Sequence, residues 1–142
     1  MFVQNINHAM KRTTMRTFAT KAKATPRHVV VVDGVRTPFK RSSTDFDDMK
    51  AYDLGRIAIK GLMDKTALKP SDIDYVSFGT VIQEVKTHNL ARECALGAGL
   101  LKTTPAHTVS MACISSNQAI TTGAEKILSG RADVILAGGA ET

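Results

Sequence analysis

From residue 28 onwards, short runs of apolar and β-branched residues alternate with longer stretches in which apolar residues recur every three to four positions. The short runs have the composition of strands, and the longer stretches have the spacing of helices that bury one face. Strands are expected at 28–33, 75–81, 107–112 and 132–137, and helices at about 51–66, from Asn89 to about Gly99, and from Cys113 to about Gly130. This order, β-α-β-α-β-α-β, is typical of an α/β fold.

The four expected strands are predicted to form a mostly parallel sheet with helices on both faces, because strand-helix-strand crossovers are right-handed. The segment 28–33 is almost continuously apolar, which is the form of a strand buried on both faces. Ligands of such sheets bind beyond the carboxyl ends of the strands. Cys113 directly follows a predicted strand and is therefore expected at that edge.

Charge divides the chain into two parts. Residues 1–27 hold six basic and no acidic residues, whereas residues 28–142 hold 13 of each. A neutral folded part argues against nucleic acid as a partner, because phosphate binding needs a basic surface. A basic, Thr-containing start without acidic residues is typical of a mitochondrial transit peptide, and a charged tail without an address is the alternative. We therefore predict a targeting segment, 1–27, and a folded domain, 28–142.

The apolar runs do not indicate a membrane-spanning segment, and the spacing of the cysteines does not indicate a metal site. Apolar runs such as 29–32 are far shorter than the roughly 18 residues that span a bilayer. Cys94 and Cys113 do not belong to a C-x-x-C pair, so a zinc site is not supported. The absence of a secretory signal indicates a reducing compartment and free thiols.

Cys113 is the candidate nucleophile. At the start of a helix it would meet unpaired backbone N–H groups and the positive end of the helix dipole, and both favour a thiolate. Its position alone leaves an inert buried thiol equally open. Cys94 lies on the apolar stripe of the second predicted helix, where a packing role is expected.

A cysteine nucleophile needs an acid/base partner, and the histidines offer no convincing one. His107 is expected at the opposite end of its strand, roughly 20 Å from Cys113 at about 3.3 Å per residue. His88 precedes the second helix, where a turn could approach the same edge, although a surface role is the alternative. Gly138 and Gly139 end the last strand, either for close approach to a ligand or for an ordinary turn.

Four segments in order resemble the thiolases. Residues 110–119, SMACISSNQA, resemble the nucleophile turn of that family, and residues 30–39, 78–83 and 137–141 resemble its first, second and fourth strands. The resemblance implies thiolytic cleavage of a 3-ketoacyl-CoA in fatty-acid β-oxidation. Cys113 would form an acyl-thioester, and its backbone N–H would be one oxyanion donor. Coenzyme A would be a co-substrate, with no bound cofactor or metal.

Within the family, residues 81–87 and 112–119 are most similar to the β subunits of mitochondrial trifunctional proteins, and Ile114 replaces the smaller residue common in other thiolases. That similarity implies a homodimer, an α-subunit partner and association with the mitochondrial inner membrane. Thiolases have a second half that supplies acid/base residues, so these residues are expected to be an incomplete N-terminal domain, inactive alone. The alternatives are a non-catalytic short product that pairs with full-length subunits, and a condensing enzyme with a cysteine at the same turn.

Overall fold

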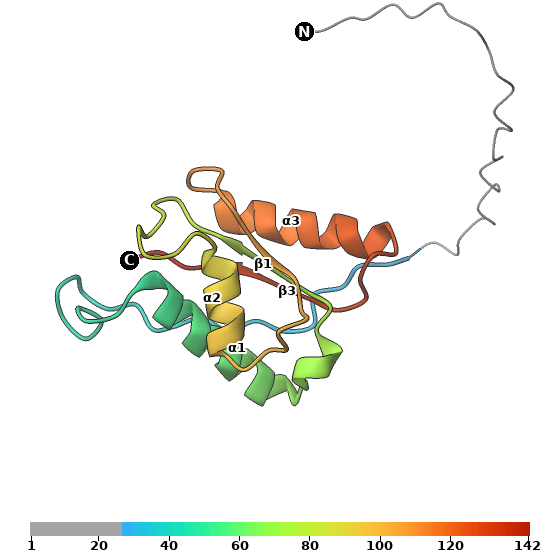
Figure 1. Ribbon diagram of the computed structural model, residues 1–142, viewed down its shortest axis with the longest axis horizontal. Coiled ribbons are helices and arrows are strands. Elements are labelled where there is room, and N and C mark those ends of the chain that lie inside the picture. Colours follow the sequence, from blue (N-terminus) through green and yellow to red (C-terminus); the bar gives the residue numbers. More distant parts are fainter. Residues whose placement is uncertain (1–26) are drawn as a thin grey trace, which may run out of the picture.

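The computed structural model describes residues 27–142 (Figure 1). The predicted targeting segment therefore lies outside the described residues, except for Arg27. In chain order the elements are α1 (Ala51–Thr66), a short 3-10 helix η1 (Pro70–Asp72), β1 (Tyr75–Gly79), α2 (Leu90–Gly97), β2 (Ala106–Val109), α3 (Ser115–Leu128) and β3 (Ile135–Gly139).

The three strands form a parallel sheet in the order β2-β1-β3. The central strand β1 places Ser77 opposite His107 on one side and Ala137 on the other. Helix α3 covers one face of the sheet, while α2 packs on the other face together with α1 (Figure 1). The predicted α/β class, the parallel strands and the helices on both faces are confirmed.

The expected first strand, 28–33, is not formed. This segment has no strand assignment, and its valines at 30, 31 and 32 are 74–85% exposed. Its ends are held by side chains instead, because Arg27 pairs with Asp133 and the Nζ of Lys65 lies 2.8 Å from the carboxylate of Asp33. A continuous apolar run indicates a capacity for burial, but a strand also needs a sheet edge to pair with, and neither β2 nor β3 pairs with this segment.

The other predicted elements are present, and several of them have shifted ends. Helix α1 has the expected bounds, and α2 follows Asn89, whose side chain accepts the N–H of Arg92 at 3.1 Å. The strands predicted at 75–81 and 107–112 end earlier, at Gly79 and Val109, because the chain leaves the sheet there for the loops of the site. The last strand, expected at 132–137, runs three residues later at its start and two at its end.

The hydrophobic core lies between the sheet and the pair α1 and α2. Its most buried members come from β1 and α2, and it comprises Ala51, Ile59, Met63, Ile73, Val76, Phe78, Leu90, Ala91, Cys94, Ala95, Leu100 and Leu136. The two helices approach closely at Gly55, where an added Cβ would lie 2.5 Å from the Sγ of Cys94. Among the described residues, no helix is both long and apolar enough to span a membrane.

Candidate active site

Cys113 lies beyond the carboxyl ends of the three strands, between the end of β2 and the start of α3. It is exposed and not disulfide-bonded. A cavity of about 360 Å³ opens beside it, lined by Gly79, Thr80, Val81, Ala112, Cys113, Ser115, Ser116, Gly139, Ala140 and Glu141. The first regular residue of α3 is Ser115, so Cys113 lies just before the helix rather than in its first turn. The predicted edge of the sheet is confirmed as the location of this thiol.

The turn that carries Cys113 is strained and clamped. Ala112, directly before it, has a φ of +47°, in the left-handed region that residues with a Cβ avoid. The buried hydroxyl of Ser115 donates to the carbonyl oxygen of Ala112 at 2.6 Å and accepts the N–H of Met111 at 2.8 Å. Residues in such sparsely populated conformations cluster at functional sites, where the surroundings hold them.

Two glycines let the first turn of α3 approach the ends of the strands. A Cβ at Gly79 would lie 2.3 Å from the backbone carbon of Ser115, and one at Gly139 would lie 2.0 Å from the hydroxyl oxygen of Ser116. The sequence left a ligand or an ordinary turn open at Gly139, and the close approach observed there is to the protein's own helix. Gly138 has no such restriction, since its Cβ would only touch the ring of Phe78 at 3.5 Å.

Glu141 is a residue of the cavity to which sequence reasoning assigned no role. Its carboxylate accepts the backbone N–H groups of Val81 at 2.7 Å and of Ile82 at 3.1 Å, and the hydroxyl of Thr80. The available signal was its position shortly after a predicted parallel strand, at the edge where ligands bind.

His107 does not line the cavity of Cys113, as expected from the length of its strand. It lies on β2 with its Nε2 3.3 Å from the hydroxyl oxygen of Ser77. Burial lowers the pKa of its imidazole, and the nearby charge of Lys126 lowers the same pKa further. A neutral histidine in this place pairs with a buried serine and has no contact with the thiol.

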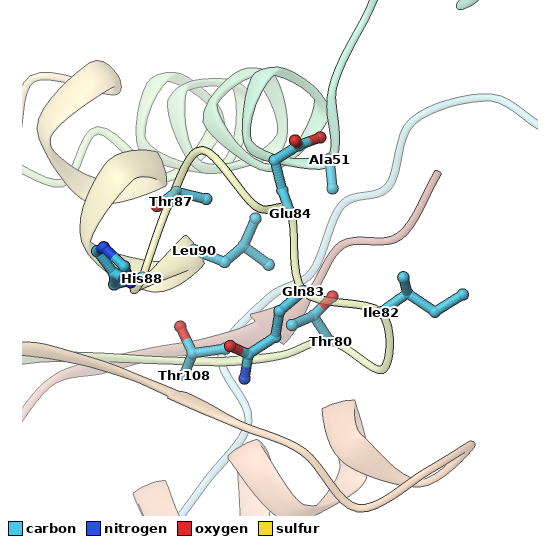
Figure 2. Close-up of a pocket in the computed structure, with 9 residues that line it drawn as sticks. All are labelled: Ala51, Thr80, Ile82, Gln83, Glu84, Thr87, His88, Leu90 and Thr108. Atoms are coloured by element: carbon cyan, nitrogen blue, oxygen red, sulfur yellow. The ribbon is translucent and has the colours of Figure 1, made fainter.

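His88 lines a separate, smaller pocket between the start of α1, the loop after β1 and the start of α2 (Figure 2). Its volume of about 10 Å³ is enough for about one water molecule. Figure 2 shows Glu84 pointing toward the start of α1, where its carboxylate lies 3.9 Å from the Nζ of Lys50. Since His88 is exposed and absent from the cavity of Cys113, the structure does not bring the two residues together.

Cys94 is fully buried in α2, and the predicted packing role is confirmed. Burial raises the pKa of its thiol to about 12. Its Sγ donates to the carbonyl oxygen of Tyr52 at 3.5 Å. Among residues 27–142, no group of three or more His, Cys, Asp or Glu side chains is arranged to hold a metal ion.

The family description "Thiolase, N-terminal domain" matches residues 29–142, which is nearly all of the described chain. The chain belongs to the thiolase family. Thiolases are acyltransferases, and the family match covers the turn with Cys113, the strands that lead to it and the end of β3.

The curated relatives of this thiolase chain include mitochondrial proteins. The human "Trifunctional enzyme subunit beta, mitochondrial" is 59% identical over 126 residues, which cover 89% of this chain and 27% of the relative. The "Probable 3-ketoacyl-CoA thiolase" of Caenorhabditis elegans is 51% identical over 128 residues, covering 90% of this chain and 29% of the relative. The chain therefore spans less than a third of the length of these relatives.

A solved thiolase structure agrees with the fold. The acetyl-CoA acetyltransferase of Bacillus anthracis superposes with a TM-score of 0.66 at 30% sequence identity, covering 69% of this chain and 25% of that chain. The thiolase-like fold implied by the resemblance of the four sequence segments is thereby confirmed.

Proposed function

We propose that this chain supplies the nucleophile of a mitochondrial 3-ketoacyl-CoA thiolase, with Cys113 as the residue that carries the acyl group. The observation that supports this most directly is the location of Cys113. It is an exposed thiol on a clamped, strained turn, beside a cavity at the carboxyl edge of a parallel sheet. The second thiol, Cys94, is buried and stays protonated, so it does not compete for this role.

In the proposed reaction the thiolate of Cys113 attacks the keto carbonyl carbon of a 3-ketoacyl-CoA. The bond between C2 and C3 breaks, C2 takes a proton, and acetyl-CoA leaves. The thiol of a second coenzyme A then attacks the acyl-thioester on Cys113, releasing a shortened acyl-CoA and restoring the thiolate. The backbone N–H of Cys113, at the turn before α3, is proposed as one donor to the oxyanion that forms during acyl transfer.

Proton transfer in this scheme needs groups that residues 27–142 do not place at the cavity. None of the described residues that line it is a histidine or a second cysteine. Glu141 makes its hydrogen bonds to the loop after β1. We therefore propose that the acid/base groups come from a second half of the full-length enzyme, and that residues 1–142 alone do not turn over substrate.

The relatives named as trifunctional β subunits support a finer assignment. We infer that the full-length protein acts in mitochondrial fatty-acid β-oxidation on acyl-CoA substrates, as a homodimer with an α-subunit partner at the inner membrane. The basic residues 1–27 support the mitochondrial address. Fusion of residues 1–27 to a fluorescent protein tests the mitochondrial targeting. A diffuse signal that does not overlap mitochondria would contradict it.

The test of the chemistry uses the full-length enzyme that contains these residues, with Cys113→Ser and, as a matched control, Cys94→Ser. Mixing wild type with a 3-ketoacyl-CoA in the absence of free coenzyme A should leave an acyl group on Cys113, detected by mass spectrometry of its peptide. Cys94→Ser should retain this adduct, and Cys113→Ser should lose both the adduct and thiolysis. Full thiolase activity in Cys113→Ser would refute the proposed role.

The full-length enzyme also tests the first alternative function. A condensing enzyme would instead form a carbon–carbon bond from a malonyl thioester and release carbon dioxide. The second alternative is tested by producing residues 1–142 together with full-length subunits, because a non-catalytic short product would co-purify with those subunits.

A further inference from the structure

The side chain of Glu141 holds the loop that follows β1. One carboxylate oxygen accepts the N–H of Val81 at 2.7 Å, and the other accepts the N–H of Ile82 at 3.1 Å. The buried hydroxyl of Thr80 donates to the same carboxylate at 3.3 Å. Hydrogen bonds to an ionised acceptor are stronger than those between neutral groups, and two successive backbone N–H groups form a concave site for an anion.

This contact joins two neighbouring strand ends. Glu141 follows β3 by two residues, and the N–H of Ala140 donates to the carbonyl oxygen of Gly79 at 3.1 Å, which continues the pairing of β3 with β1. From this position the carboxylate of Glu141 bonds to the loop that follows the end of β1. The loop is thus fixed to the sheet by a side chain that lies 60 residues away in the sequence.

The fixed loop is also a wall of the candidate active site. Thr80, Val81 and Glu141 line the same cavity as Cys113. Val81 is 45% exposed and supplies apolar surface to this region. The polar atoms of Glu141 are engaged with the loop, so its effect on a substrate is transmitted by the loop.

We propose that Glu141 is a positioning residue of the thiolase, which shapes the acyl-binding wall beside Cys113 by holding the backbone of residues 80–82. The proposal rests on the proposed function, because it names acyl-CoA as the molecule that this wall contacts. It predicts an effect on substrate binding and no direct effect on the reactivity of the thiol.

The experiment compares Glu141→Gln, Glu141→Asp and the control Glu125→Gln in the full-length enzyme. Gln has nearly the same shape but replaces one accepting oxygen with a donor that would face a loop N–H. Asp keeps the negative charge but is one methylene too short to reach both N–H groups. Glu125 is an exposed carboxylate on α3 outside the cavity.

Three measurements separate loop positioning from other roles. In both Glu141 variants, amide hydrogen exchange in the peptide containing Val81 and Ile82 should become about tenfold faster, the loss expected for one charge-assisted hydrogen bond. KM for the 3-ketoacyl-CoA should rise by about five- to tenfold with kcat within about a factor of two, because binding common to the ground and transition states is lost. The alkylation rate of Cys113 by iodoacetamide should stay within about a factor of two of wild type. Glu125→Gln should match wild type in all three.

Several results would overturn the proposal while leaving Cys113 as the nucleophile. Unchanged exchange in Glu141→Gln would show that the carboxylate does not hold the loop. Faster exchange with unchanged KM would show that the loop does not affect substrate binding. If Glu141→Asp had the same KM and the same amide hydrogen exchange as wild type, the negative charge alone, and not the hydrogen bonds to the loop, would account for the effect of Glu141. If amide hydrogen exchange became faster throughout the protein in both variants, Glu141 would be a general structural residue. If the wild-type enzyme formed no acyl adduct on Cys113, the proposed function itself would be refuted.

Discussion

The hydroxyl of Ser115 donates to the carbonyl oxygen of Ala112 at 2.6 Å, across the turn that contains Cys113. The hydroxyl oxygen of Ser115 also accepts the N–H of Met111, so one buried side chain that follows Cys113 holds two backbone groups that precede it. The φ of +47° at Ala112 is a conformation that costs a residue with a Cβ about 1–2 kcal/mol. The Ser115 hydrogen bonds therefore offset strain stored next to the thiol.

Ser115→Ala is expected to lower the free energy of unfolding of the chain by about 1–3 kcal/mol, because both hydrogen bonds of its buried hydroxyl are lost, and each contributes about 0.5–1.5 kcal/mol. The matched control is Ser129→Ala, which removes an exposed hydroxyl bonded to the carbonyl oxygen of Lys126 and should cost less than about 0.5 kcal/mol. Urea unfolding followed by circular dichroism measures both. Equal losses in the two variants would show that Ser115 has no special role in the turn.

Gly79→Ala is expected to destabilise the chain by about 1–3 kcal/mol, because its Cβ would overlap the backbone of α3 at Ser115, 2.3 Å away. Gly61→Ala is the opposite case. Gly61 lies inside α1, and an added Cβ there meets nothing within 4 Å, so the substitution should stabilise by about 0.5–1 kcal/mol. Urea denaturation of the two variants should give changes of opposite sign. Tolerance of Ala at position 79 would mean that α3 can move away from the sheet without cost.

The elements decided by local pattern were predictable from sequence. Helix α1 has an apolar stripe long enough to fix its bounds. The Asn89 side chain caps α2 through a hydrogen bond to a residue only three positions away in the sequence. The position of Cys113 followed from a strand-to-helix junction, which is also a local feature. Its strained neighbour, Ala112, was not predictable, since nothing in an alanine indicates a positive φ.

The features that depend on neighbours distant in the sequence were not predictable. The segment 28–33 has the composition of a buried strand, yet no sheet edge among the described residues pairs with it. The contact of Glu141 with Val81 depends on β3 lying beside β1, an order that an alternating pattern of strands and helices does not specify. The pattern thus indicated which residues reach the edge of the sheet but not which of them meet.

Reactivity should separate the two thiols. Burial raises the pKa of Cys94 to about 12, so iodoacetamide at pH 8 should label Cys113 in the folded chain and both cysteines only in denaturant.

The raised pKa of Cys94 also makes the stability of the fold depend on pH. The thiol of Cys94 keeps its proton in the folded state, whereas in the unfolded chain it loses the proton above its ordinary pKa of 9.0. The contribution of this thiol to the free energy of unfolding is therefore fully present below pH 9 and is lost as the pH rises toward 12.

Unfolding measured from pH 8 to 10.5 should therefore show a steeper loss in wild type than in Cys94→Ala, by up to about 1.4 kcal/mol per pH unit. Identical slopes for wild type and Cys94→Ala would contradict the buried, protonated state of this thiol.

His107 should titrate below its ordinary pKa of 6.5, since burial lowers the pKa first and Lys126 lowers it further. The folded state then binds fewer protons than the unfolded chain near and below pH 6.5, so stability decreases as the pH falls through this region. Lys126→Gln should raise the pKa of His107 only part of the way, because burial remains, whereas Lys102→Gln, at an exposed position on a loop, should leave it unchanged. Nuclear magnetic resonance titration of the imidazole protons measures all three proteins. A full return to the ordinary value in Lys126→Gln would make the charge, and not burial, the main cause.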